Sequence, residues 1–518
     1  MSAQGSPPWY GSITEPRELG WHLMKNTSGS SIPRIVVVGG GISGLAAAHR
    51  TLELAHQLSR PIDLMLLEAG SRLGGVIHTS EREGFLLEGG PDSFISDKPW
   101  ALSLCRRLGL EPNLIGTGDT HRRSFIVRQG KLQPVPDGFY LLAPTRIWPT
   151  ITTRVFSWPG KIRMSADLLL PRRKLSSSTD DESLANFVRR RLGQEALDRM
   201  AQPMVGGIYT ADPEQLSLRA TMPRFLEMER EHRSLILAMW RHRQNMRHSP
   251  NHQASGPRYG LFVSLNQGMG RLVGAIYQRL PPDSIRLNTQ VAALRRGPSG
   301  RQWSLDLTDG TQLEADAVCL ALAAFQSADL LKGLDAELAT KLHSIPYAST
   351  ATVNLAYRLE DVPTPLEGFG FVVPAIEKRE ILACTFSHMK FPGRAPHGHA
   401  LLRAFMGGAL QPKTFDYVDD EMIRIVRQNL RELLGIENAP AFALVQRHAR
   451  AMAQYRVGHL DVLADIENRV KRYETLQLAG NGFTGIGIPD CVRRAEECAE
   501  HLLDTLNAPP AQSSRFSP

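Results

Sequence analysis

The stretch RIVVVGGGISGLAAAHR, residues 34–50, constrains the fold most, because it joins a short apolar run to an alanine-rich segment through clustered glycines. The three valines Val36–Val38 are typical of a buried strand, and the residues from about Ile42 through Ala48 predict a helix. A strand, glycine turn and helix in this order bind the pyrophosphate of a dinucleotide. We therefore expect a Rossmann-like α/β domain with a phosphate cradle at this turn.

The three spaced glycines of the turn have separate predicted roles. Gly39 allows the chain to turn sharply, Gly41 lets backbone amides approach a pyrophosphate, and Gly44 lets the helix pack closely on the strand. The helix N-terminus supplies unpaired N–H groups and partial positive charge. We therefore predict that Ile42 and Ser43 also lie at the phosphate site.

A second apolar strand, in PIDLMLLEAG, ends at Glu68. A carboxylate at this point accepts hydrogen bonds from an adenosine ribose and disfavours a ribose 2′-phosphate. Glu68 and the following Ala69 are therefore predicted cofactor contacts. Glycine-rich turns between a strand and a helix also occur purely for packing, and this first motif alone leaves that alternative open.

Two further glycine features follow within about 55 residues of the first, more than a nicotinamide site requires. The segment RLGGVIHT adds Arg72, Gly74 and Gly75 as candidate cofactor contacts. The segment LLEGGPDSF adds Gly90, Pro91 and Asp92. This density of glycine turns indicates an extended dinucleotide that runs past the edge of the sheet.

A second strand, glycine turn and helix lie near the C-terminus, in LQLAGNGFTGIGIPDCVRRAEECAEHL. A helix that starts near Ile488 and points its N-terminus at the N1 and C2 carbonyl edge of a flavin stabilises the charge of the reduced ring. The paired motifs therefore favour one FAD over a nicotinamide, although an ordinary helix packed on the sheet is the alternative. The candidate contacts in this segment are Gly480, Gly485, Gly487, Ile488 and Pro489.

A chain of 518 residues exceeds one core, so two or three domains are expected. No run reaches the roughly 18 apolar residues of a spanning helix. Residues 1–31 lack a secretory signal and predict a disordered tail. The odd number of cysteines, without metal-type spacing, predicts free buried thiols, no bound metal and a reducing, cytoplasmic compartment. The cysteines are Cys105, Cys319, Cys384, Cys491 and Cys498.

The formal net charge of +8 is unevenly spread. Residues 146–175 combine basic with apolar and aromatic side chains, which suits the surface of an anionic membrane. A solvated helical connector is the alternative, and nucleic acid is not expected because no recognised binding motif accompanies the charge. The basic residues are Arg146, Arg154, Lys161, Arg163, Arg172, Arg173 and Lys174, and the apolar ones are Trp148, Phe156, Trp158 and Leu168–Leu170.

The order of these and later motifs resembles the oxygen-dependent protoporphyrinogen and coproporphyrinogen oxidases of haem synthesis, over about residues 34–502. The most particular motifs are PMVGGIYTADPEQLSLR, which spans Pro203–Arg219, and FPGRAP, which spans Phe391–Pro396. The resemblance implies a mixed α/β and α+β architecture. Its parts are a discontinuous FAD-binding domain of the amine-oxidase and glutathione-reductase type, a sheet-based substrate domain and a helical domain in contact with a membrane.

On this resemblance we expect the FAD-binding domain to comprise residues 32–98, 256–333 and 447–508. The helical domain is expected over 99–255 and the substrate-binding sheet over 334–446. Within the helical part, residues from 180 to 246 show helical periodicity, beginning with an apolar face. The residues of that face are Leu184, Phe187, Val188, Leu192 and Leu197. A second disordered tail is expected at 509–518.

The implied reaction is oxidation of protoporphyrinogen IX to protoporphyrin IX in three two-electron hydride transfers to FAD, with O2 as acceptor and H2O2 as product. Coproporphyrinogen III as substrate is the alternative. An amine oxidase, a carotenoid desaturase and a non-catalytic carrier on the same fold are less favoured. FAD is expected to be non-covalently bound, and the oligomeric state stays open, with a homodimer as one alternative.

The resemblance also implies substrate contacts. Phe391 is expected to pack on a pyrrole ring beside Val372, and the backbone carbonyl of Gly207 to face the ring nitrogens. Ser124 stands where many relatives carry an arginine, so Arg123 is the expected anchor for a substrate carboxylate, with Arg122 or a different anchor as the alternatives. Core packing for the two apolar side chains and a simple turn at the glycine are the alternatives.

Two further positions follow from the aligned motifs. Val291, in IRLNTQVAALRR, is a predicted cofactor contact. Ala453, in MAQY, replaces a proline that is usual in the family, which loosens the local backbone.

Overall fold

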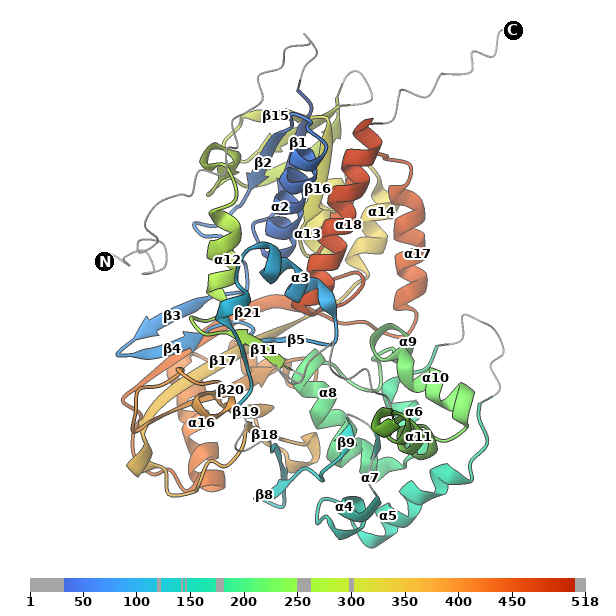
Figure 1. The fold of residues 1–518 in the computed structure, drawn as a ribbon, viewed down its shortest axis with the longest axis vertical. Coiled ribbons are helices and arrows are strands. Elements are labelled where there is room, and N and C mark those ends of the chain that lie inside the picture. The colour runs from blue at the N-terminus through green and yellow to red at the C-terminus, as the bar shows by residue number, and fades with distance from the viewer. Residues whose placement is uncertain are drawn as a thin grey trace.

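The central sheet of the protein carries both strand–turn–helix motifs (Figure 1). The computed structural model describes residues 32–118, 123–140, 143–144, 147–173, 181–248, 262–297 and 302–507. Both predicted tails lie outside these residues. The five strands of the sheet run parallel in the order β12, β2, β1, β16 and β22. Their bounds are Ile285–Arg286, Asp63–Leu67, Arg34–Val38, Ala317–Ala321 and Leu476–Ala479.

Alternate side chains of β1 pack against two different layers. Ile35 and Val37 face a core shared with helices α2, α3, α12 and α18. Val36 and Val38 face a core shared with α13, α14, α17 and a three-stranded antiparallel sheet of β13, β14 and β15. A parallel strand buried on both faces reads as a continuous apolar run, as this one does. The confirmed α/β layer follows directly from that pattern.

The helices of these layers are α2 (Ile42–Gln57), α3 (Pro99–Arg107), α12 (Gly270–Tyr277), α13 (Ala324–Leu331), α14 (Ala336–His343), α17 (His459–Val470) and α18 (Ile488–Asn507). The accompanying strands are β13 (Val291–Arg296), β14 (Trp303–Leu307) and β15 (Gln312–Ala315). Helices α2 and α18 lie side by side along the sheet (Figure 1). The two motifs, more than 400 residues apart, therefore share one layer.

A seven-stranded sheet forms the second layer system, in the order β21, β17, β20, β19, β18, β7 and β8. The bounds are Phe442–Ala453, Tyr347–Arg358, His399–Gly407, Ala383–Phe386, Gly370–Val372, Phe125–Arg128 and Lys131–Pro134. Helix α16 (Asp419–Leu434) packs its apolar face into the core of this sheet. The expected domain limits differ here: β7 and β8 come from the segment assigned to the helical domain, and β21 crosses the limit at 446.

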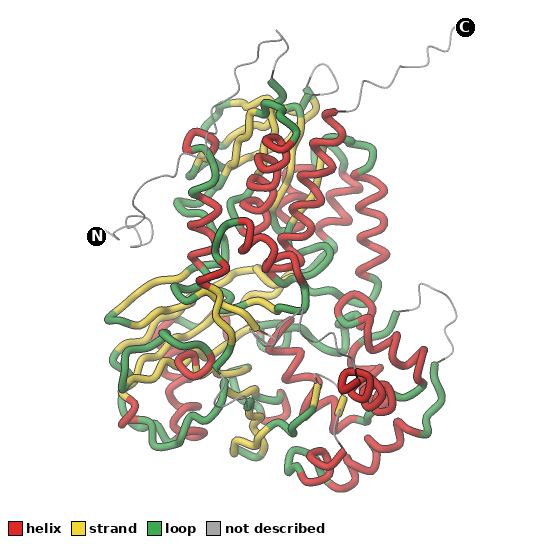
Figure 2. Tube along the Cα trace, viewed as in Figure 1, coloured by secondary structure: helices red, strands yellow, loops and turns green. Residues whose placement is uncertain are grey.

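The helical part lies at the opposite end of the molecule from the parallel sheet (Figure 2). It contains α4 (Ile147–Thr152), α5 (Trp158–Ser165), α6 (Leu184–Arg191), α7 (Gln194–Ala196), α8 (Gln202–Tyr209), α9 (Leu218–Thr221), α10 (Pro223–His232) and α11 (Leu235–His248). The five residues of the predicted apolar face are all at most 2% exposed, which confirms the periodicity. A π-helical turn over Leu197–Ala201 leads directly into α8.

Smaller elements connect these parts. They are the hairpin β3 (Thr79–Arg82) and β4 (Phe85–Glu88), the three-stranded sheet β5 (Phe94–Ile95), β11 (Phe262–Leu265) and β6 (Leu114–Gly116), the pair β9 (Phe139–Tyr140) and β10 (Ala143–Pro144), and the short helix α15 (Ser387–Lys390). The five cysteines are buried, and none of them forms a disulfide in the described structure. Among the described helices, none is long and apolar enough to cross a membrane.

Candidate active site

The first glycine turn has the backbone geometry that its three roles demand. Gly39 has φ +106°, and a Cβ there would stand 2.6 Å from the carbonyl oxygen of Ala321. A Cβ on Gly44 would overlap the carbonyl oxygen of Gly39, whereas one on Gly41 would meet no described atom within 4 Å. Two of the glycines therefore serve turning and packing, and the third leaves an open face. A pyrophosphate on that face remains a prediction.

The N-terminus of α2 is free to bind an anion. Helix α2 begins at Ile42, and in the described structure no side chain caps its first turn and no acidic residue lies in it. The first N–H groups of a helix lack intrahelical acceptors and carry partial positive charge. Ser43 is buried in this turn, while Gly41 and Ile42 are half-buried. The residues present therefore fit the pyrophosphate of a dinucleotide.

The RLGGVIHT turn lies directly against the first one. Gly74 donates its N–H to the carbonyl oxygen of Gly40 at 2.8 Å, and Gly74 forms a parallel bridge with Gly41. The guanidinium of Arg72 donates to the carbonyl oxygens of Gly75 and Ile77, at 2.6 and 3.1 Å. Arg72 thus closes its own turn, and Gly75 stays exposed at the rim of the site.

Glu68 lies between the two turns. Its carboxylate accepts N–H groups from Gly40 at 2.6 Å and from Gly70 at 2.7 Å, and the neighbouring Ala69 is exposed. Each oxygen keeps a lone pair for a ligand, which fits the predicted ribose contact. The carbonyl of Glu68 accepts the N–H of Thr289 at 2.9 Å. This bond brings the start of β13 to the site, but the side chain of Val291 is 6% exposed and belongs to the core.

The second glycine turn converges on the first. Gly480 has φ +131°, and a Cβ there would stand 2.6 Å from the carbonyl oxygen of Leu322. Leu322 follows Ala321, the residue that Gly39 touches, so both turns meet consecutive residues at the end of β16. The side chains of Ser43 and Cys491 are hydrogen-bonded between the first turns of α2 and α18. The two helix N-termini therefore lie together.

Helix α18 begins at Ile488, as predicted, and Pro489 occupies its first turn. Gly485 has φ +136°, and a Cβ there would overlap the carboxylate of Asp490. Both oxygens of that carboxylate accept hydrogen bonds from Lys98 Nζ, at 2.7 Å for Oδ1 and 2.6 Å for Oδ2. Gly485 and Gly487 are half-buried, so the turn keeps a face toward the site.

Side chains of the seven-stranded sheet bind the backbone carbonyls of the LLEGGPDSF turn. The carbonyl of Gly89 accepts the Thr352 hydroxyl at 3.0 Å and lies 2.9 Å from His448 Nε2, and Arg403 donates to the carbonyl of Gly90. A Cβ on Gly90 would overlap the carbonyl oxygen of Val76, so this turn also packs on the RLGGVIHT turn. Pro91 is half-buried beside it.

The carboxylate of Asp92 is already engaged by protein groups. Lys390 Nζ lies 2.9 Å from both of its oxygens. Burial acts to raise the pKa of Asp92, but the cations of Lys390 and Arg403 outweigh it and hold the pKa well below its usual range. Asp92 is therefore a permanent anion within an ion-pair network. The predicted cofactor contact at this residue stays untested.

Glu88 is a buried acid that the motif analysis passed over. It accepts the Thr79 hydroxyl and the N–H of Met269, both at 2.7 Å. Burial raises its pKa to about 7, although Arg394 at 4.0 Å opposes the shift. Glu88 lies inside a quoted motif, but its partners come from other segments: Thr79 from the paired strand β3 and Met269 from the residue before α12. In the sequence, Arg394 looks like an ordinary loop residue and Arg403 like an ordinary strand residue, so neither is marked as a neighbour of Glu88.

Two of the predicted substrate contacts lie together beside α8, and a third precedes the strand that pairs with β18. A Cβ on Gly207 would stand 3.9 Å from Val372 Cγ1, so α8 and β18 face each other here. Arg123 precedes β7, which pairs with β18, and its carbonyl accepts the N–H of Phe369 at 2.8 Å. Gly207 and Arg123 are exposed and Val372 is half-buried. An apolar wall and a cation are therefore available to a ligand.

Phe391 has different surroundings. It follows α15, is 1% exposed, and its ring centre lies 5.2 Å from Lys390 Nζ and 5.7 Å from the guanidinium carbon of Arg394. It is thus part of the buried network around Asp92. A contact with a pyrrole ring requires this side chain to turn outward, and that contact stays a prediction.

Within the described residues, no group of three or more His, Cys, Asp or Glu side chains is placed to hold a metal ion. The site is thus built from glycine turns, two helix N-termini and a half-buried apolar wall.

The model of the family described as flavin-containing amine oxidoreductase matches residues 42–503. Fold and match together define the class, a flavin-dependent oxidoreductase, and confirm the predicted flavin cofactor.

Similar proteins narrow the class. The coproporphyrinogen III oxidase of Bacillus subtilis (strain 168) is 35% identical over 91% of this chain and 98% of its own length. That of Propionibacterium freudenreichii subsp. freudenreichii is 36% identical over 93% of both chains. The chloroplastic protoporphyrinogen oxidase 1 of Spinacia oleracea is 29% identical over 91% of this chain and 84% of its own.

Solved structures agree. The crystal structure of a putative protoporphyrinogen oxidase from Exiguobacterium sp. 255-15 superposes with a TM-score of 0.80 at 31% identity, over 93% of this chain and 100% of that one. The cyclohexylamine oxidase of Brevibacterium oxydans IH-35A, with a TM-score of 0.64 at 15% identity over 92% of this chain and 100% of that one, shares the fold alone. This chain belongs to the coproporphyrinogen III and protoporphyrinogen oxidases within the flavin-containing amine oxidoreductases, which confirms the resemblance seen in the motifs.

Proposed function

We propose that this chain oxidises a porphyrinogen to a porphyrin in three two-electron steps, with FAD as cofactor and O2 as the final acceptor, giving H2O2. The observation that carries the proposal is the convergence of two remote glycine turns on the end of β16. Coproporphyrinogen III is the favoured substrate, because the bacterial relatives with that activity in their names are 35% and 36% identical, against 29% for the spinach enzyme. Protoporphyrinogen IX is the second candidate.

The residues that would hold FAD follow from the geometry. The open face of Gly41 and the first turn of α2 receive the pyrophosphate, and Glu68 accepts the ribose hydroxyls. The first turn of α18 faces the flavin ring. When bound, FAD accepts a hydride from the substrate and passes the electrons to oxygen. Its attachment is non-covalent.

The protein positions the substrate. A porphyrinogen is flat, apolar and edged with carboxylates, which suits a half-buried aliphatic wall beside a cation. Val372 and the backbone of α8 at Gly207 supply the wall, and the exposed guanidinium of Arg123 binds a carboxylate at the edge. The pyrrole nitrogen's lone pair assists departure of the methylene hydride, so the reaction needs orientation more than a protein base.

Anaerobic mixing tests the proposal. The holoenzyme is mixed with reduced coproporphyrinogen III or protoporphyrinogen IX, and flavin absorbance near about 450 nm is followed. Faster bleaching by coproporphyrinogen III is expected, and faster bleaching by protoporphyrinogen IX selects the second candidate. If neither porphyrinogen bleaches a flavin that dithionite does reduce, the proposed function is wrong.

The proposed location is peripheral to a membrane, in the cytoplasm, through α4, α5 and the residues that follow. Trp148, Trp158, Ile162 and Leu169 are 73, 65, 70 and 82% exposed. Trp158 and Ile162 stand one turn apart on one face of α5. Lys161 Nζ donates to the carbonyl of Ile151 at 2.6 Å and so ties α5 to α4. Exposed apolar side chains of this size suit insertion into a lipid surface.

Some of the residues that the sequence predicts at the membrane surface do not lie on it. Phe156 is 2% exposed and belongs to the core, because it packs beneath α5. Arg163 donates to carbonyls at the end of α6, and Arg173 pairs with Glu182 at 3.4 Å, so these cations face protein. Arg146 and Lys174 lie outside the described side chains. Of the predicted basic set, Arg154 and Arg172 are exposed beside the apolar groups of this surface.

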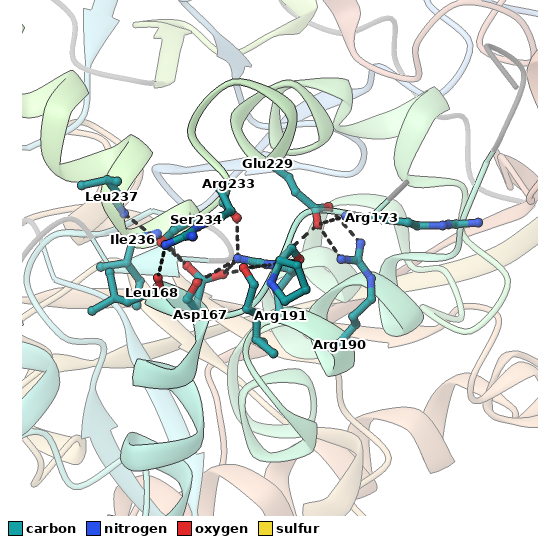
Figure 3. A network of polar contacts seen from close by, with 12 residues as sticks. Asp167, Leu168, Arg173, Arg190, Arg191, Glu229, Arg233, Ser234, Ile236 and Leu237 are labelled. Carbon is teal, nitrogen blue, oxygen red and sulfur yellow. Dashed lines mark hydrogen bonds and ion pairs between the residues drawn. The ribbon is translucent and has the colours of Figure 1, made fainter. Parts of the chain in front are cut away.

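A buried network holds the most exposed of these residues in place (Figure 3). Asp167 accepts Arg191 Nε at 2.7 Å and the Ser234 hydroxyl at 2.6 Å, and both charged side chains are fully buried. Arg191 also donates to the carbonyl of Pro171 at 3.0 Å. Leu168 and Leu169, next to Asp167 in the chain, are thereby fixed outward.

Vesicle sedimentation tests the membrane contact. The double variant Trp158→Ser, Leu169→Ser is expected to lose most of its binding to vesicles of anionic phospholipid. Val418→Ser is the control, because Val418 is 68% exposed but lies at the start of α16. Equal binding by all three proteins contradicts the contact.

A homodimer stays a prediction, which the mass of the protein in solution checks.

A further inference from the structure

Strand β21 and the residues after it contact both the LLEGGPDSF turn and the second glycine turn. His448, on β21, lies against the carbonyl of Gly89, as described above. The side chain of Asn481, in the second glycine turn, donates to the carbonyl of Ala451 on β21 at 2.8 Å. Tyr455 follows two residues after β21 ends and contacts the second turn again. The seven-stranded sheet thus has a direct connection to the turn that opens α18.

The hydroxyl of Tyr455 bridges two ends of that turn. It donates to the carbonyl of Asn481 at 2.7 Å and accepts the N–H of Gly485 at 2.8 Å. The side chain is 1% exposed, and burial raises its pKa well above the usual range, so the hydroxyl keeps its proton. Both hydrogen bonds lie away from water, where an unpaired partner is costly.

The ring of Tyr455 is fixed as well. It stacks on His459 with ring centres 4.0 Å apart and an angle of 12° between the planes. His459 Nε2 in turn lies 3.1 Å from the carbonyl of Phe483. The pair therefore contacts the turn at residues 481, 483 and 485.

The turn needs this support because of its glycines. Gly480 and Gly485 have φ +131° and +136°, where glycine has no strong preference of its own. The adopted conformation decides where the first turn of α18 points, and three of the eight residues that follow Gly480 are also glycines. Groups outside the turn must then select one conformation.

We propose that Tyr455 is a positioning residue that aims the N-terminus of α18 at the flavin ring through the Gly485 N–H and the Asn481 carbonyl. The inference rests on the flavin at this site and not on the identity of the substrate. Partial positive charge at that helix end stabilises the reduced flavin. Loss of the bridge moves the helix end and makes the flavin harder to reduce.

Redox titration of the holoenzyme tests the proposal. Tyr455→Phe keeps the ring and its stacking and removes only the two hydrogen bonds. The midpoint potential of its flavin is expected to shift to more negative values, with a change in the visible flavin spectrum. Tyr357→Phe is the matched control: Tyr357, on β17, is also 1% exposed, and its hydroxyl is hydrogen-bonded to Arg427 of α16. This control is expected to keep the wild-type potential.

If Tyr455→Phe does not retain flavin, a second variant allows the same redox titration. His459→Phe preserves an aromatic neighbour but removes the contact with Phe483, and it is expected to shift the potential in the same direction by less. An unchanged potential in the variant that can be purified overturns the proposal, and so does an equal shift in Tyr357→Phe. These titrations use dithionite and need no porphyrinogen, so they stand apart from the test of the proposed function.

Discussion

The cofactor edge and the substrate wall of this protein are built in opposite ways. At the cofactor edge, backbone atoms of three segments touch, and a Cβ on Gly39, Gly44 or Gly90 would strike a carbonyl oxygen. At the substrate wall, a Cβ on Gly207 would keep an ordinary distance of 3.9 Å to Val372 Cγ1, and Gly207 is exposed. At Gly39, Gly44 and Gly90 the cofactor edge has no room for a larger side chain, whereas the substrate wall includes exposed residues that can be replaced without a steric clash. Cofactor binding and substrate choice are therefore separable by mutation.

The largest expected effect comes from two glycines three residues apart. Gly44→Ala places a Cβ on the carbonyl of Gly39 and is expected to destabilise the protein by about 3 kcal/mol or more. Gly41→Ala meets no described atom and is expected to keep the melting temperature of the apoprotein while weakening FAD binding. Thermal unfolding with and without FAD measures both. Equal loss of stability in the two variants contradicts the assignment of Gly41 to the ligand.

The next effect is a pH dependence from Glu88. Burial raises its pKa to about 7 from 4.5, so between these values the folded chain holds a proton that the unfolded chain has released. The free energy of unfolding therefore falls as the pH rises through this window, by about 3 kcal/mol from this group. Glu88→Gln keeps an oxygen acceptor for the Met269 N–H, while its amide N–H group can donate to the Thr79 hydroxyl oxygen, and the variant is expected to remove this component. Denaturant unfolding at about pH 5 and about pH 8 checks it, and identical pH profiles for both proteins rule it out.

A smaller loss is expected at Glu68. Glu68→Ala removes the acceptor between Gly40 and Gly70 and is expected to weaken FAD binding by about 1–3 kcal/mol. Titration of apoprotein with FAD measures the change, with the exposed Glu83→Ala as control. Wild-type affinity in the Glu68 variant would remove the ribose contact from the account.

The smallest effect belongs to the substrate wall. Arg123→Met removes an exposed cation and is expected to lower kcat/KM for a porphyrinogen about tenfold, mainly through KM, while the flavin spectrum stays unchanged. Arg456→Met is the control, since Arg456 is also exposed. A lost flavin spectrum in Arg123→Met would mean that the two regions are not separable.

The same contrast explains what the sequence predicts well. Glycines at positive φ and in close contact, such as Gly39 and Gly485, are visible in sequence because no other residue fits there. The parallel strand β1 is visible because it is apolar throughout. These signals are local, and they were sufficient to predict the α/β layer and the flavin.

The remaining features depend on partners far away in the chain. Tyr455 and Arg403 read as ordinary residues of a loop and a strand, and only the folded chain brings them to glycine carbonyls and amides. Phe156 appears in sequence as part of an exposed basic and aromatic surface but is 2% exposed. Phe391 is 1% exposed, and its substrate contact stays a prediction. Sequence periodicity does not tell an apolar residue of the core from one at a ligand.

Titration of two apoprotein variants with FAD tests the central claim most directly. Gly41→Ala and Gly487→Ala alter turns at opposite ends of the chain, and each new Cβ keeps ordinary distances to the protein, with 3.5 Å to the Asp490 carboxylate as the shortest. If both turns hold the same flavin nucleotide, each variant has a clearly higher Kd for FAD while its apoprotein melts like the wild type. A wild-type Kd in either variant would contradict the shared site.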